Sequence, residues 1–398
     1  MNGAFNGAKE RTRPAIRPCK SRRSDQVRNR PVCQCGSPAR GILRKAVFLR
    51  VMIAMLLIMA TSLTGCGSVQ QSEQDDGRLR IVATIFPPYD FARAIAGDET
   101  KADITMLLSP GEEVHSYEPT PMDIKRIQNC DLFLYVGGEN DVWVERILEN
   151  MGDKKPQTLR LVDLTDTVAE EVVEGMMEER GEHEHEHDAE HAEEAEHDHE
   201  HISHTHSGDS SAEEHEEADE HVWTSPVKAA EITEAIAAKM AEIDPDNAES
   251  YKANAASYME EILKVDAAFR EIVDNAERRT IVFGDRFPLR YFAEEYGLEY
   301  FAAFPGCSSE SEPSASTLAF LIDKVREEQI PVVFSIELSN GNIARAICES
   351  TGAVRRTFHS CHNVTKDEME SGATYVSLMT ENLGPVREVL GDKSVAAE

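Results

Sequence analysis

Leu132-Phe133-Leu134-Tyr135-Val136 is an uninterrupted apolar run that ends at the pair Gly137-Gly138. Successive side chains of a strand point to opposite faces, so both faces of this strand must be covered by other parts of the chain. Strands buried on both faces are typical of parallel sheets with helices on either side. The run therefore predicts an α/β fold.

The segments before this run alternate between strand and helix patterns. Strands are predicted at 79–85 and 104–108, where Phe86-Pro87-Pro88 and Ser109-Pro110-Gly111 end them. Helical patterns lie at 89–95, 121–128 and 142–151. Strands that alternate with helices predict a doubly wound, mostly parallel sheet.

The second half of the chain repeats this organisation after one long helix. Apolar residues recur at steps of three and four positions from about 247 to 278, which predicts a rigid amphipathic connector. The strands predicted after it are 280–283, 299–304, 332–335 and 354–358, and the helices are 287–296, 316–327 and 342–350. Two doubly wound α/β lobes joined by the long helix leave a cleft between them, and ligands of such sheets bind beyond the carboxyl ends of the strands.

The N-terminal region has the features of an export signal. Basic residues precede an apolar stretch, Val51 to Leu63, that is too short to span a membrane but fits a signal peptide. Leu63-Thr64-Gly65-Cys66 looks like a bacterial lipobox, which implies that Cys66 is lipidated and becomes the first residue of the mature protein. The alternative is a buried core segment with an incidental cysteine. The extension before the signal is either removed with it or lies upstream of the true start codon.

Charge and cysteine content narrow the possible functions. The net charge is −32 and the chain after the leader is strongly acidic, which excludes nucleic-acid binding through a basic surface. A hydrophobic content of 41% is sufficient for two lobes with real cores. Four cysteines of the exported part could form a disulfide, whose pairing the sequence does not give: Cys130, Cys307, Cys348 and Cys361.

Residues 178–220 break every periodic pattern. They are almost entirely Glu, His, Asp, Ala and Ser, so this segment cannot bury enough apolar surface to order itself and is expected to be a disordered loop. Its imidazoles and carboxylates predict weak auxiliary metal binding, although a solvated acidic linker is the alternative. The histidines of this loop are His183, His185, His187, His191, His197, His199, His201, His204, His206 and His215.

These patterns divide the chain into successive segments. They are a leader and signal peptide (1–65), a tether (66–78), an N-terminal lobe (79–177), the His-rich loop (178–220), the end of the N-terminal lobe (221–246), a linking helix (247–279) and a C-terminal lobe (280–391).

Few histidines lie outside the loop, namely His115, His221, His359 and His362. His115 follows the predicted strand 104–108, a position suited to a metal ligand, although a solvent-exposed or hydrogen-bonded histidine is the alternative. It stands in Pro110-Gly111-Glu112-Glu113-Val114-His115-Ser116-Tyr117-Glu118-Pro119-Thr120, and His221 stands in Asp219-Glu220-His221-Val222-Trp223-Thr224-Ser225-Pro226.

Both segments resemble ligand motifs of the zinc and manganese solute-binding lipoproteins of ABC importers. The likeness extends to Tyr291–Leu298, which resembles the helix after the third ligand, and to Phe334–Glu337, which resembles a strand that ends in Glu. A His-rich loop before the second motif is typical of the zinc branch. The order of these motifs around a long helix and behind a lipobox makes the resemblance specific.

The chain departs from the family pattern at two places. Arg286 stands where the third ligand is usual, and because a guanidinium has no lone pair to offer it is expected to point away from the cleft. Asp285 is the expected replacement, with Glu337 in reserve, although these carboxylates could instead form a salt bridge or cap a helix. His359 stands where the family usually has an Asp. The alternative for His359 and His362 is a surface turn without metal.

The ligand set implied by the resemblance is His115, His221, His359 and Asp285. Three imidazoles and one oxygen suit tetrahedral Zn²⁺ better than Mn²⁺. The function implied is a monomeric, non-enzymatic receptor, anchored to the outer face of the cytoplasmic membrane through Cys66, that delivers zinc to an ABC permease. A manganese or iron receptor is the alternative within the family. A zinc-dependent hydrolase and an adhesin or structural lipoprotein are alternatives of other classes.

Overall fold

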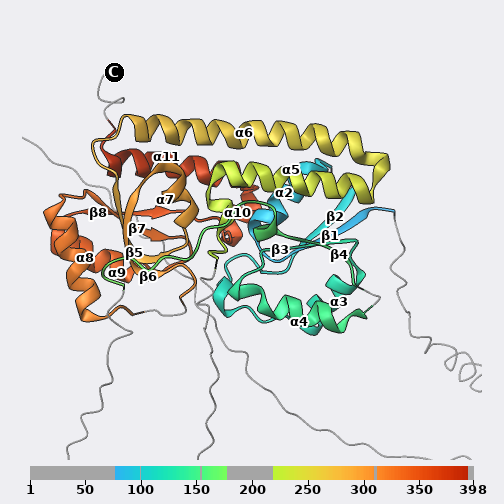
Figure 1. Ribbon diagram of the computed structural model, residues 1–398, viewed down its shortest axis with the longest axis horizontal. Helices are drawn as coiled ribbons and strands as arrows, with labels where there is room; N and C mark the ends of the chain where they lie inside the picture. The colour runs from blue at the N-terminus through green and yellow to red at the C-terminus, as the bar shows by residue number, and fades with distance from the viewer. Residues whose placement is uncertain (1–76, 99, 153–154, 177–217, 309–311, 393–398) are drawn as a thin grey trace, which may run out of the picture. The chain divides into compact units, whose positions relative to one another are not determined.

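The computed structural model describes residues 77–98, 100–152, 155–176, 218–308 and 312–392 (Figure 1). The leader, Cys66, the tether up to residue 76 and all ten loop histidines therefore lie outside the described residues. No helix within the described ranges is long and apolar enough to cross a membrane.

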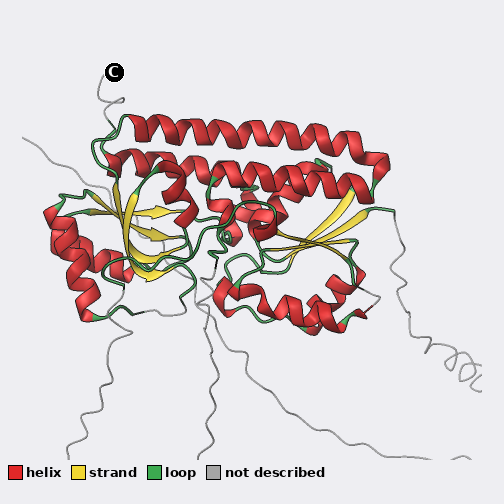
Figure 2. Ribbon diagram, viewed as in Figure 1, coloured by secondary structure: helices red, strands yellow, loops and turns green. Residues whose placement is uncertain are grey.

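The N-terminal lobe is built on a four-stranded parallel sheet (Figure 2). The strand order is β2-β1-β3-β4, and all four residues of β3 are buried, as the apolar run predicts. Its strands are β1 (Leu79–Ala83), β2 (Ala102–Met106), β3 (Leu132–Tyr135) and β4 (Gln157–Arg160), and its helices are α2 (Phe86–Ala96), α3 (Pro121–Asn129) and α4 (Val142–Asn150).

The C-terminal lobe repeats this arrangement, with strand order β6-β5-β7-β8 and parallel pairing throughout. Its strands are β5 (Thr280–Phe287), β6 (Glu299–Pro305), β7 (Val332–Ile336) and β8 (Val354–Phe358). Its helices are α7 (Arg290–Tyr296), α8 (Ala315–Glu327), α9 (Asn342–Thr351), α10 (Lys366–Ser371) and α11 (Tyr375–Leu390). In both sheets the second strand of the order is the first in sequence, which is the pattern of a doubly wound sheet.

The long predicted helix is α6 (Ala248–Asp274). Its buried face includes Tyr251, Tyr258 and Phe269, spaced for one side of a helix, and it packs on α2 and α5 (Pro226–Ile243) as well as on α11 (Figure 1). The helix therefore contacts elements of both lobes.

A buried carboxylate fastens three of these helices together. Asp90 of α2 accepts hydrogen bonds from Arg93 on its own helix, from the hydroxyl of Tyr258 on α6 and from the backbone N–H of Tyr375 at the start of α11. Arg93 also donates to the carbonyl of Ala373 at 2.8 Å. Because Asp90 is only 1% exposed, these bonds cannot be replaced by bonds to water without opening the packing.

The structure corrects several predicted boundaries. Helix α2 begins at Phe86 rather than at residue 89, because its two prolines occupy the first turn, where their missing N–H groups cost nothing. Strand β5 continues to Phe287, with a register shift between Phe283 and Arg286, so α7 begins at Arg290 instead of 287. Strand β4 and helices α10 and α11 were not predicted.

The segment after β4 leaves its sheet and contacts the C-terminal lobe. The N–H of Val168 donates to the hydroxyl of Tyr291, the hydroxyl of Thr317 donates to the carbonyl of Gly175, and the N–H of Cys307 donates to Glu170. Ala169 forms an isolated bridge with Ala218, the first described residue of the predicted loop 178–220. The end of that loop is thereby fixed three residues before His221.

Candidate metal site

His221 has a ring orientation fixed by a neighbouring carboxylate. It precedes a single 3-10 turn, Val222–Thr224, and is 0% exposed. Asp219 accepts hydrogen bonds from the backbone N–H of His221 at 2.8 Å and from ring atom Nδ1 at 2.9 Å. With the ring proton on Nδ1, Nε2 keeps its lone pair, and within the described residues Nε2 has no hydrogen-bond partner. A carboxylate behind the imidazole is the usual support of a metal-binding histidine.

The electrostatic surroundings of His221 are acidic. Burial lowers the pKa of this histidine, but the carboxylates of Asp219, Glu220 and Glu170 outweigh burial, and the pKa is raised above its ordinary value. A site with this excess of negative charge attracts cations.

Two glycines allow close packing around these side chains. A Cβ on Gly306 would lie 3.0 Å from Cε1 of His221, and a Cβ on Gly138 would overlap the carboxylate of Glu220. Glu220 is further held by the backbone N–H and side-chain amide of Asn140. Its position is therefore set from the N-terminal lobe.

His362, from the loop after β8, meets His221 across the lobes. Their ring centroids are 4.6 Å apart, and the ring of Trp223 lies 4.8 Å from that of His362. The ligand atoms of Glu220, His221 and His362 all lie within 4.8 Å of one another. These side chains are 3%, 0% and 7% exposed, so a cation among them would be largely removed from water.

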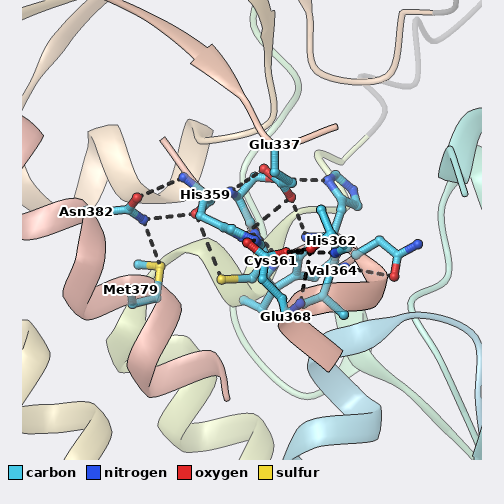
Figure 3. Close-up of polar contacts among 12 residues, drawn as sticks. Glu337, His359, Cys361, His362, Val364, Glu368, Met379 and Asn382 are labelled. Atoms are coloured by element: carbon cyan, nitrogen blue, oxygen red, sulfur yellow. Dashed lines mark hydrogen bonds and ion pairs between the residues drawn. The ribbon is translucent and has the colours of Figure 1, made fainter. Parts of the chain in front are cut away.

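Glu337 organises the loop that carries His362 (Figure 3). Its carboxylate accepts hydrogen bonds from the N–H of Ser360 at 2.7 Å, from the hydroxyl of Ser360 at 2.7 Å and from the N–H of His362 at 3.1 Å. Glu337, the reserve ligand of the sequence analysis, thus holds the loop of His362 through three hydrogen bonds.

His359 lies in the same loop but faces another direction. Asn382 pairs with its backbone N–H and C=O, and the backbone N–H of Cys361 donates to Nδ1 of His359 at 3.0 Å (Figure 3). Since a backbone N–H can only donate, Nδ1 is an acceptor and the ring proton of neutral His359 is on Nε2, 3.8 Å from Oε1 of Glu368. Neither ring nitrogen then offers a lone pair to a metal, and His359 is not a member of the Glu220–His221–His362 group.

Asp285 and Arg286 border a separate cavity of about 160 Å³ next to Glu337. Asp285 lies within β5, where its carboxylate accepts from the N–H of Arg286 at 3.0 Å and from that of Ile336 at 3.4 Å, and burial raises its pKa. The expectation that Arg286 points away from the cleft is wrong. Its guanidinium lines this cavity and pairs with Glu113 of the N-terminal lobe at 3.2 Å, because the acidic loop of the first motif lies opposite.

His115 is in the short 3-10 turn Val114–Ser116. Its neighbours Glu113 and Val114 line a cavity of about 20 Å³ together with His362 and Asn363, which is room for roughly one water molecule or ion. The side-chain amide of Asn363 donates to the carbonyls of Ser109 and Glu112, so the loop of the first motif is tied to the loop of His362. The backbone thus brings the segment of His115 to the same cavity.

Sequence reasoning named His221 but left Glu220 and His362 out of its ligand set. Both were visible as neighbours of assigned residues, in Asp-Glu-His at 219–221 and in His-x-x-His at 359–362. Cys130, Cys307, Cys348 and Cys361, all within the described ranges, form no disulfide.

The chain is similar to known proteins of zinc uptake. Residues 81–389 match the family model described as zinc-uptake complex component A, periplasmic. The chain is 30% identical to the high-affinity zinc uptake system protein ZnuA of Bacillus subtilis, over 87% of this chain and 98% of that protein. It is 28% identical to the zinc-binding lipoprotein AdcA of Streptococcus pneumoniae over 88% of this chain, but spans only 62% of that relative's length.

A solved structure has the same fold. The Zn(II)-bound ZnuA-like domain of Streptococcus pneumoniae AdcA superposes with a TM-score of 0.59 at 26% identity, covering 79% of this chain and 99% of that domain.

Proposed function

Because the chain belongs to the family of the periplasmic component A of zinc-uptake complexes, we propose that it is an extracytoplasmic receptor that binds Zn²⁺ and delivers it to an ABC-type importer. The observation that carries the proposal is the buried group of Glu220, His221 and His362 at the junction of the two lobes. Two imidazoles and a carboxylate within reach of one ion are a typical zinc ligand set.

The proposed ligands are His221, His362 and Glu220, with His115 as the ligand from the first motif. Arg286 takes no part in coordination, and Asp285, Glu337 and His359 are engaged in hydrogen bonds that hold the surrounding loops. A set rich in nitrogen favours Zn²⁺ over Mn²⁺, which prefers more oxygen ligands.

A receptor fits this site better than a hydrolase. Catalytic zinc needs an open position for water and a general base beside it. Here Glu220, His221 and His362 are nearly inaccessible to solvent. The one His-Glu-x-x-His match in the sequence, His183 to His187, lies in the His-rich loop and includes none of these three residues. A closed site retains an ion without turning over a substrate.

The location of the protein and its partners follow from the same assignment. Cys66 would be the lipid anchor on the outer face of the cytoplasmic membrane, the partner would be a membrane permease, and the receptor would act as a monomer. The His-rich loop is proposed to collect metal beside the site, since the chain re-enters the described fold three residues before His221.

The test is a titration of the metal-free protein with Zn²⁺ and with Mn²⁺ in the presence of a competing chelator, which hides the weak loop sites. We expect one tight Zn²⁺ site per chain and much weaker Mn²⁺ binding. Glu220→Gln and His362→Ala should each weaken that site. Tight Mn²⁺ binding, or zinc binding that is indifferent to both substitutions, would refute the assignment.

A further inference from the structure

We propose that Ser360 is a positioning residue, which links Glu337 to His362 and fixes the proton of the His362 ring on Nδ1, so that Nε2 presents its lone pair to the metal. This inference rests on the proposed function, because it assigns a role around the same zinc ligand. It concerns the metal-free protein, however, and can be tested without any metal.

The contacts of the Ser360 hydroxyl define the link. Its Oγ lies 2.7 Å from Oε1 of Glu337 and 3.2 Å from Nδ1 of His362. Both distances are within hydrogen-bond range, so the hydroxyl stands between a carboxylate and an imidazole.

The direction of each bond follows from the groups involved. A carboxylate that accepts two backbone N–H groups, those of Ser360 and His362, is an acceptor for the hydroxyl as well. The single hydroxyl proton of Ser360 is therefore donated to Glu337. Toward Nδ1 of His362 the oxygen can then only accept, which places the ring proton on Nδ1.

This protonation is the one that a ligand needs. With its proton on Nδ1, neutral His362 keeps the lone pair on Nε2, as His221 does through Asp219. His359 is the internal contrast, because its Nδ1 accepts from the N–H of Cys361 and its proton is on Nε2. Two histidines three residues apart in one loop are thus set in opposite tautomers.

The link is held in place by its surroundings. Ser360 is 0% exposed, and its carbonyl accepts a hydrogen bond from Nε1 of Trp223 at 2.9 Å. Trp223 belongs to the turn after His221. The serine that orients one candidate ligand is therefore fixed by the segment that carries the other.

The test measures the tautomer of His362 by nuclear magnetic resonance on the purified, metal-free protein labelled with ¹⁵N-histidine. The signals of His362 are assigned by their absence in His362→Gln. We expect a protonated Nδ1 in the parent protein and in Ser335→Ala, a control that removes another buried hydroxyl from the same lobe, on strand β7. In Ser360→Ala we expect a mixture of tautomers or a protonated Nε2.

Zinc affinity provides the second measurement. Loss of an orienting partner typically weakens metal binding by about 10- to 100-fold, so Ser360→Ala should lose at least about tenfold while Ser335→Ala matches the parent. An unprotonated Nδ1 in the parent, or an unchanged tautomer or affinity in Ser360→Ala, would overturn the inference. A parent with protonated Nδ1 but no tight zinc site would instead refute the proposed function and leave the tautomer assignment standing.

Discussion

A histidine can bind a metal only through a ring nitrogen that carries no proton, so backbone hydrogen bonds decide which histidine of a loop is a ligand. In the His359–His362 loop the N–H of Cys361 occupies Nδ1 of His359, whereas His362 faces His221. We therefore expect His362→Ala to weaken zinc binding by about a hundredfold or more, the usual consequence of losing one of four ligands. His359→Ala, its matched control, should weaken zinc binding far less. Competition titration of the two variants measures the difference, and equal losses would contradict the ligand choice.

The acidic surroundings of His221 predict how zinc affinity depends on pH. The raised pKa of His221 means that protons compete with zinc at a higher pH than for an ordinary histidine. Affinity should therefore begin to fall at a higher pH than the ordinary imidazole range would give. In Asp219→Asn the pKa of His221 drops, so the fall moves to lower pH, while affinity above pH 8 is reduced about tenfold because the ring loses its orienting partner. A pH titration in which the two curves have the same midpoint would contradict this.

Single residues also show where sequence reasoning ends. The sequence places His359 and His362 correctly after strand β8, but spacing alone cannot distinguish them. The distinction depends on Glu337, which accepts from the N–H of His362, and on Cys361, which has a left-handed backbone with φ of 63° and donates its N–H to Nδ1 of His359. Neither is encoded in a local pattern.

At the scale of elements, the side chain of Glu368 places helix α10 next to the His359–His362 loop. Glu368 forms a capping box with Thr365, and its pKa is lowered to about 2, chiefly by the neighbouring ring of His359, whose Nε2 lies 3.8 Å away, and then by the hydrogen bonds with Thr365. A carboxyl whose pKa is lowered by folding stabilises the folded state at pH values above its ordinary pKa. This stabilisation is lost as the pH falls toward 2. Glu368→Gln should therefore unfold more easily than the parent at pH 6. The difference should vanish near pH 2, which denaturant titrations at several pH values can measure.

Periodicity predicted the strands and helices well but misjudged where they stop. The run at 132–136 correctly predicted a strand buried on both faces, because that signal is carried by its own residues. The extension of β5 to Phe287 was missed, because it depends on pairing with Phe304 and Pro305 of β6 after a register shift. That pairing places Asp285 inside a strand, where its carboxylate accepts a hydrogen bond from the N–H of Ile336.

At the scale of the whole molecule, the proposed function assigns the tight site to the two lobes and an accessory role to the His-rich loop. Deleting residues 183–215 should lower the number of zinc ions bound and leave one tight site, because Glu220, His221 and His362 are all outside the deletion. Native mass spectrometry of the deleted and parent proteins counts the ions. Complete loss of tight binding would show that the loop itself is the receptor site.

The proposed anchor is independent of both lobes. Cys66→Ala should release the protein from the membrane fraction with unchanged zinc affinity, since residue 66 lies ahead of the first strand at Leu79. Fractionation with and without detergent, with signal processing checked by mass, provides the measurement. A processed variant that still needs detergent for extraction would argue against a lipid anchor.

The buried carboxylate of Asp90 affects which movement of the protein can release a bound metal ion. It joins α2 to α6 through the hydroxyl of Tyr258 and to α11 through the N–H of Tyr375, so a wide rotation of one lobe against the other would strain these buried hydrogen bonds. The loop around His362 is tied to the N-terminal lobe by three short contacts: the amide of Asn363 on the carbonyls of Ser109 and Glu112, the N–H of Gly111 on the carbonyl of Val364, and the N–H of Phe86 on the carbonyl of His362. We therefore expect the bound ion to leave when these loops open locally, because this breaks fewer hydrogen bonds than a movement of the lobes. The residence time of the ion should then depend on how the membrane partner contacts the loops around His362 and Ser109, and not on a rotation of the whole lobes.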